Sequence, residues 1–94
     1  MIPIQLSGHG VEITSTLSEF VDKKFARVRK HSLQITKIHI FFNVNKYTQK
    51  AEATIHVPGC EIFASAESED MYKTINLLVD KVVRQLDKHK GKNH

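Results

Sequence analysis

The residues best suited to chemistry are cations in the segment from Glu67 to Lys90, which starts with acidic residues and ends with basic ones. If this segment is one helix, with about 100° between successive residues, its cations form a stripe beside the apolar face. The stripe consists of Lys73, Lys81, Arg84 and Lys88. Asp80 and Asp87 fall on the other flank. Separation of charge by sign indicates a partner that carries phosphates. Such contacts recognise the backbone and shape of a nucleic acid rather than its base sequence.

A second cationic stripe is expected on a shorter helix that ends near Lys30. Lys23, Arg27 and Lys30 share its exposed side. If the two helices lie side by side on one face of a sheet, their stripes join into one basic surface for RNA phosphates. The alternative is two solvated faces with local ion pairs, because Asp80 and Arg84 are spaced for such a pair.

The polar turn at residues 45–50 places an aromatic side chain between lysines. Its candidate contacts are Lys46, Tyr47 and Lys50. We weigh two roles for Tyr47, which are stacking on a nucleobase and partial packing as an anchor of the turn.

Aromatic and histidine side chains are predicted on the face of the sheet that points away from the helices. They are His39, Phe41, His56 and Phe63. Aromatic residues on an open sheet are typical of RNA-binding platforms. Partial cover of an exposed face and self-association remain alternatives.

The sequence has no arrangement typical of catalysis, because it lacks a glycine-rich phosphate loop, a Ser/His/Asp set and a convincing carboxylate pair. Cys60 follows Pro58 and Gly59 with no evident base nearby, so we interpret it as an unreactive turn residue. His39 and His56 lack a third metal ligand. We therefore expect no enzyme activity, no cofactor and no metal.

Length and composition predict one small globular domain. The chain has 94 residues, of which 40% are hydrophobic and 26% charged, enough for a single core. The net charge of +4 favours an anionic partner. The single cysteine excludes an internal disulfide and is consistent with a reducing compartment. Because we see neither a signal peptide nor an apolar stretch of the ~20 residues that a membrane span needs, we expect a cytoplasmic protein.

The elements that must position these residues follow from hydrophobic periodicity. Alternation of apolar and polar residues predicts four strands, at about 2–6, 38–44, 51–57 and 62–66. Spacing of three and four residues predicts two amphipathic helices, at about 17–30 and 69–90. Thr14, Ser15 and Thr16 are all candidate caps of the first helix, and the capping-box pattern starts at Thr16. We expect Ser68 as the cap of the second helix, and a flexible basic tail at about 89–94.

The predicted order of elements is β-α-β-β-β-α. A helical crossover places the first strand parallel to a neighbour. We therefore predict a single α+β domain over residues 1–94, with a four-stranded mixed sheet and both helices packed on one face.

Several segments spread over nearly the whole chain resemble the ribosome hibernation promoting factors. These segments are 10–14, 20–26, 53–57, 61–67, 70–72 and 80–90. The resemblance is to the short form, in a group that includes ribosome-associated inhibitors and sigma-54 modulation proteins. It implies a fold similar to double-stranded-RNA-binding domains. It also implies an rRNA contact by the cations at Lys24, Arg27, Lys81, Arg84, Lys88 and Lys90, to which the stripe on the first helix adds Lys23 and Lys30.

The resemblance further implies binding to 16S rRNA and neighbouring ribosomal proteins in the decoding channel of the 30S subunit. There the protein would block mRNA and tRNA, inhibit translation in stationary phase and promote inactive 100S ribosome dimers. We expect a monomer in isolation, with no membrane or small-molecule partner. The alternative is a protein-interaction module, such as a transcription modulator that acts through the open sheet face.

Overall fold

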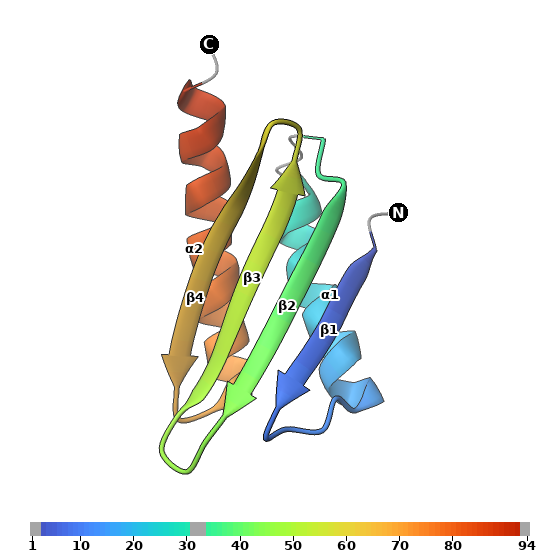
Figure 1. The fold of residues 1–94 in the computed structure, drawn as a ribbon, viewed down its shortest axis with the longest axis vertical. Helices are drawn as coiled ribbons and strands as arrows, with labels where there is room; N and C mark the ends of the chain where they lie inside the picture. The colour runs from blue at the N-terminus through green and yellow to red at the C-terminus, as the bar shows by residue number, and fades with distance from the viewer. Residues whose placement is uncertain (1–2, 31–33, 93–94) are drawn as a thin grey trace.

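The structure is a computed structural model that describes residues 3–30 and 34–92. Its elements are β1 (Ile4–His9), α1 (Ser15–Lys30), β2 (Lys37–Val44), β3 (Gln49–Val57), β4 (Cys60–Ser68) and α2 (Met71–Lys92). The strands form one sheet in the order β1-β2-β3-β4, and both helices cover the same face of it (Figure 1). Strand β1 is parallel to β2, whereas the β2–β3 and β3–β4 pairs are antiparallel. The predicted element order and mixed sheet are therefore confirmed.

The first strand extends further along the chain than its apolar pattern predicted. It pairs with β2 from Ile4, opposite Ile38, as far as His9, opposite Asn43. Gly10 then turns the chain with a φ of +74°, and a Cβ atom at this position would overlap the carbonyl oxygen of Val44. Glycine is thus required where the chain leaves the sheet for α1. Ile2, which the sequence analysis assigned to this strand, lies outside the described residues.

One hydrophobic core fills the space between the sheet and the helices. Alternate residues of β2 and β3 are buried, and the core face of α2 packs on β3 and β4. Four alanines on β3 and β4 leave room for this helix, namely Ala51, Ala53, Ala64 and Ala66. Among the described residues, the one buried polar side chain is Thr74, whose hydroxyl donates a hydrogen bond of 2.9 Å to the carbonyl of Gln49. This bond ties the first turns of α2 to the start of β3.

The cap of α1 is one of the predicted candidates, whereas the cap of α2 differs from the prediction. The hydroxyl of Thr14 accepts a hydrogen bond from the backbone N–H of Leu17, so Thr14, and not Thr16 of the capping-box pattern, is the candidate that caps α1. A carboxylate oxygen of Asp70 accepts one from the N–H of Lys73, so Asp70 caps α2 instead of Ser68. In each case several neighbouring residues had suitable side chains, and the local backbone decided among them.

The C-terminal helix is longer than the sequence indicated. Residues 89–92, which were expected to begin a flexible tail, belong to α2. Residues 93 and 94 lie outside the described part of the chain. In the ranges 3–30 and 34–92, neither helix is long and apolar enough to cross a membrane.

Candidate nucleic-acid interface

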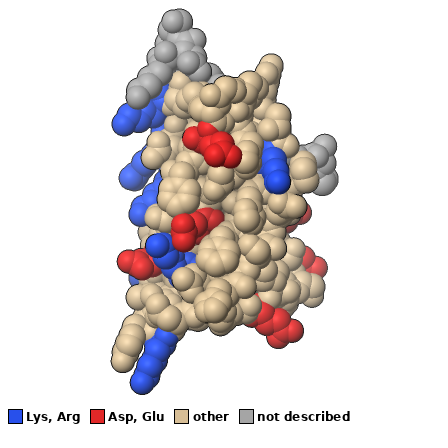
Figure 2. Space-filling model, viewed as in Figure 1, with Lys and Arg blue, Asp and Glu red and all other residues tan. Residues whose placement is uncertain are grey.

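Helix α2 presents different chemistry on its two flanks. Asp80 lies on the flank that packs beside α1, whereas Lys81 and Lys88 lie on the flank that borders β4. The predicted separation of charge on this helix is therefore present in the structure. In Figure 2, basic side chains gather along the edge of the molecule formed by α2, and only scattered charges lie on the open sheet face.

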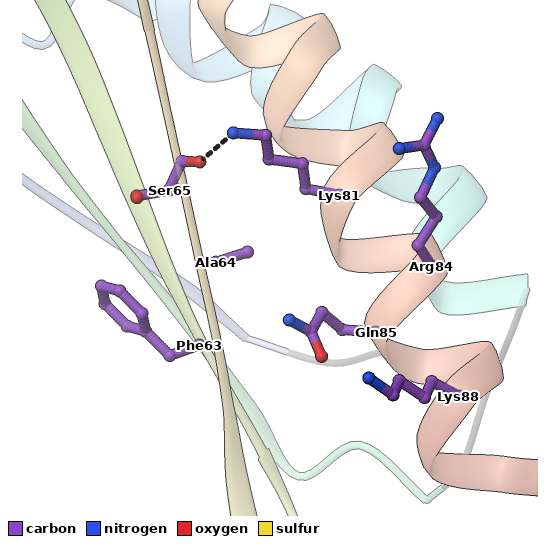
Figure 3. Close-up of a pocket in the computed structure, with 7 residues that line it drawn as sticks. All are labelled: Phe63, Ala64, Ser65, Lys81, Arg84, Gln85 and Lys88. Carbon is purple, nitrogen blue, oxygen red and sulfur yellow. Dashed lines mark hydrogen bonds between the residues drawn. The ribbon is translucent and has the colours of Figure 1, made fainter.

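We call the hollow between α2 and the outer edge of β4 the edge groove. It has a volume of about 470 Å³ and is lined by Phe63, Ala64, Ser65, Lys81, Arg84, Gln85 and Lys88. Figure 3 shows Gln85 and Lys88 reaching from α2 toward β4, while Arg84 points away from the strand. The Nζ atom of Lys81 donates a hydrogen bond of 2.9 Å to the backbone carbonyl of Ser65. An ammonium group has three donors, so Lys81 retains donors for a phosphate.

Arg84 and Lys88 are exposed, and neither forms an ion pair within the part of the chain that the structure describes. A cation without an internal partner keeps its full charge for a ligand. The edge groove therefore gathers three cations, none of which forms an ion pair among the described residues.

A second hollow, the helix groove, separates α1 from α2. It has a volume of about 310 Å³ and is lined by Lys23, Lys24, Arg27, Asn76, Val79 and Asp80. The guanidinium of Arg27 lies 2.6 Å from the carboxylate of Asp80. Lys24 extends over the ring of Phe20, with its Nζ atom 5.5 Å from the ring centroid. One anion and three cations thus share this groove.

The cations therefore line two grooves on opposite flanks of α2, and not the single surface that was predicted. Asp80 pairs with Arg27 across the helices, and not with Arg84 along its own helix as the alternative had it. Lys73, which the helical stripe included, pairs instead with Glu69 at 3.2 Å, near the start of α2. A hydrogen bond from the backbone N–H of Glu69, together with Lys73, lowers the pKa of the Glu69 carboxyl below its usual value.

Two predicted contacts lie at the C-terminal ends of the helices. Lys30 is exposed in the last turn of α1. Lys90 belongs to α2, but its side chain falls outside the described residues.

The β2–β3 turn presents Tyr47 to solvent. The side-chain oxygen Oδ1 of Asn45 accepts hydrogen bonds from the backbone N–H groups of Tyr47, at 2.9 Å, and Thr48, at 2.8 Å. The Tyr47 side chain is 80% exposed, and the Nζ atom of Lys46 lies 5.8 Å from its ring centroid. The interpretation of Tyr47 as a packed anchor is therefore wrong, and stacking on a base stays a prediction. Lys50 is the other predicted loop contact, and its Nζ atom lies 3.9 Å from a carboxylate oxygen of Glu52.

The open sheet face has its own polar contacts. His39 lies 3.0 Å from the hydroxyl of Ser7, and His56 lies 2.9 Å from the carboxylate of Glu61. Phe41 is half-buried, whereas Phe63, on the edge strand, is 54% exposed. The outward orientation predicted for these residues is confirmed. In the described ranges, no three His, Cys, Asp or Glu side chains are grouped as metal ligands.

One contact and one groove residue were not predicted from the sequence. The sulfur of Cys60 lies 3.8 Å from Nε2 of His89, so an imidazole does stand beside this thiol. The two residues are 29 positions apart, and His89 was assigned to a tail, so no local signal joined them. Gln85 lines the edge groove on the turn between Lys81 and Lys88. The helical spacing that predicted the cations also places Gln85 near them.

Comparison with known proteins supports a ribosomal connection. Residues 4–94 match the family described as Sigma 54 modulation protein / S30EA ribosomal protein. The chain is 46% identical over 89 residues to the ribosome hibernation promoting factor of Azotobacter vinelandii, covering 95% of this chain and 83% of that protein. Identity to the protein of the same name from Escherichia coli K12 is also 46%, covering 95% of this chain and 94% of that protein.

Two solved structures have the same fold. A ribosomal subunit interface protein from Coxiella burnetii superposes with a TM-score of 0.85 at 43% identity, covering 94% of this chain and 97% of that one. The N-terminal domain of Thermus thermophilus Protein Y superposes with a TM-score of 0.82 at 25% identity and the same coverage.

Proposed function

Because the chain belongs to the Sigma 54 modulation protein / S30EA ribosomal protein family, we propose that it is a ribosome hibernation factor that binds small-subunit rRNA. The observation that carries this proposal is the cationic flank of α2, where Arg84 and Lys88 are exposed and lack ion pairs among the described residues. The names of its relatives and of its structural neighbours point to the same particle.

The proposed mechanism is steric and involves no chemical step. The folded chain measures 44 × 24 × 19 Å, which suits a rod that fills a channel. We place it in the decoding channel of the 30S subunit, held to 16S rRNA by the cations of the two grooves. In that position it excludes mRNA and the anticodon ends of tRNA, silences translation in stationary phase and favours inactive 100S dimers.

Electrostatics sets how such binding responds to conditions. Each phosphate neutralised by a Lys or Arg releases condensed counterions, so the logarithm of the affinity falls with the logarithm of the salt concentration, by roughly 0.7–0.9 per contact. The long-range field of a basic protein also speeds its encounter with RNA. We expect small-subunit binding in the cytoplasm to be fast and steeply dependent on salt.

Competition on purified small subunits tests this proposal. A tRNA anticodon stem–loop and an mRNA fragment, pre-bound to the subunit, should be displaced as the protein is added, and excess mRNA and tRNA should displace the protein. Simultaneous binding of all three at saturation would place the protein outside the decoding channel.

Sedimentation of ribosomes with and without the protein tests its effect on assembly separately. The proposal expects a larger 100S fraction when the protein is added to stationary-phase extract that lacks it. An unchanged profile, with translation still inhibited, would restrict the function to silencing single ribosomes.

A further inference from the structure

The outer edge of β4 exposes backbone groups to the edge groove. Strand β4 is the last in the sheet order, so one side of it has no partner strand. The two-residue turn at Pro58 and Gly59 makes Val57 and Cys60 a hydrogen-bonded pair, and such pairs alternate along an antiparallel ladder. The N–H and C=O groups of Phe63 and Ser65 therefore point outward. The bond from Lys81 to the Ser65 carbonyl agrees with this register.

That same bond disfavours a peptide as the occupant of the groove. Native proteins protect sheet edges from strand addition by placing lysines on them. Here Lys81 already donates a hydrogen bond to the Ser65 carbonyl on this edge, and a docking strand would have to displace it. Arg84 and Lys88 add positive charge to the same wall, which suits a polyanion.

Phe63 supplies a feature that phosphate binding does not explain. The groove continues into an adjoining hollow of about 240 Å³, and the two share Phe63, Gln85 and Lys88. The Phe63 ring is 54% exposed at the rim of this trough and points to the side of β4 opposite α2 (Figure 3). A large exposed aromatic ring across the strand edge from a row of cations suits single-stranded nucleic acid, in which bases stack on rings and phosphates pair with cations.

We propose that the edge groove binds an unpaired segment of RNA, an inference that rests on the proposed function and names the kind of RNA involved. The phosphates lie against Lys81, Arg84 and Lys88, and one base crosses the edge of β4 to stack on Phe63. The base must be unpaired because both faces of a base inside a duplex are already covered by its neighbours. The amide of Gln85 is placed to hydrogen-bond the same segment.

The test uses Phe63→Leu, which keeps an apolar side chain but removes the ring, and Phe63→Tyr, which keeps the ring. Phe41→Leu is the matched control, because Phe41 lies on the same sheet face, two strands away. The probes are an unstructured, adenine-rich oligoribonucleotide of about ten nucleotides, within the range that a single small domain covers, and a duplex of equal length. Purified small subunits are the third ligand.

We expect the protein to prefer the single strand to the duplex. Phe63→Leu should weaken binding to the oligonucleotide and to the small subunit by about 5- to 150-fold, the range that corresponds to loss of one stacked base. Phe63→Tyr and Phe41→Leu should bind as the unmodified protein does. The salt dependence should be unchanged in Phe63→Leu, because no phosphate contact is lost, but shallower by about 1 in Lys88→Gln.

Four results would overturn this inference. Phe63→Leu could bind the single strand as tightly as the unmodified protein, or the duplex could compete as well as the single strand. Phe41→Leu could lose as much affinity as Phe63→Leu, or an extended acidic peptide could bind more tightly than the RNA. Thermal unfolding of each variant verifies the fold. Suppose that Phe63→Leu leaves RNA and small-subunit binding unchanged, while the Arg84→Glu/Lys88→Glu variant no longer binds small subunits. Then only this inference fails, and the proposed function stands. If the unmodified protein does not bind small subunits, the proposed function fails, and the oligonucleotides still report on the groove.

Discussion

The ion pair between Arg27 and Asp80 leads to a prediction in which removal of a charge strengthens RNA binding. The two side chains are 56% and 52% exposed, and their charged groups lie 2.6 Å apart. Exposed pairs of this kind contribute about 0.2–1 kcal/mol to the free energy of unfolding. Asp80→Asn should therefore lower stability by at most ~1 kcal/mol, which corresponds to a fall in Tm of no more than about 4–8 °C in a domain of this size.

Although Asp80→Asn lowers stability, it should strengthen RNA binding. In the helix groove the carboxylate of Asp80 neutralises one of the three cations, which are Lys23, Lys24 and Arg27. Removing it leaves Arg27 available for one more phosphate. One additional contact makes the salt dependence steeper by roughly 0.7–0.9, which is about a threefold larger loss of affinity between 50 and 200 mM salt. At low salt we expect a several-fold gain in affinity for the small subunit.

The assay is a titration of small subunits at several salt concentrations, with Asp22→Asn as the control. Asp22 pairs with Arg29 at 2.9 Å on α1, so this control makes the same change in charge outside both grooves. A gain in both variants would indicate a general effect of net charge. Weaker binding by Asp80→Asn at unchanged stability would refute the reasoning, because Asp80 would then orient Arg27 for binding instead of neutralising it.

Two further predictions concern the anchoring of α2. Thr74→Val should lower the free energy of unfolding by about 1–3 kcal/mol in urea denaturation, because the carbonyl of Gln49 loses a buried hydrogen-bond donor; a change within experimental error would contradict this. Glu69→Gln should lower stability at neutral pH, since the pKa of Glu69 is depressed and its charged form stabilises the fold. This stabilisation is present above the usual value of 4.5 and disappears as the pH falls through the lowered pKa, so Tm curves of the two proteins should converge in acid.

The strand pattern was predictable because alternation at period two depends only on neighbouring residues. The same holds for the cations of α2, whose relative positions follow from helical geometry. The choice among neighbouring cap residues was not predictable, because Thr14 and Thr16 offer the same side chain and Ser68 and Asp70 are both good caps. Only the backbone at each site distinguishes them.

The sites depend on contacts between residues that are distant in the sequence. Nothing local says that the flank with Asp80 faces α1, so the division into two grooves required the tertiary structure. The bond from Lys81 to Ser65 and the approach of His89 to Cys60 likewise follow from how α2 lies on β4. Periodicity predicts which residues share a helix face, but packing determines which neighbour that face meets.

The most direct test of the central claim is the affinity of the Arg84→Glu/Lys88→Glu variant for purified small subunits. Lys88→Glu is measured beside Lys37→Glu, which changes the charge equally at an exposed position on β2, away from both grooves. If the cationic flank of α2 binds rRNA, the double variant should lose at least about tenfold in affinity, with a salt dependence shallower by about 2, while Lys37→Glu binds normally. Unchanged binding by the folded double variant would contradict the account.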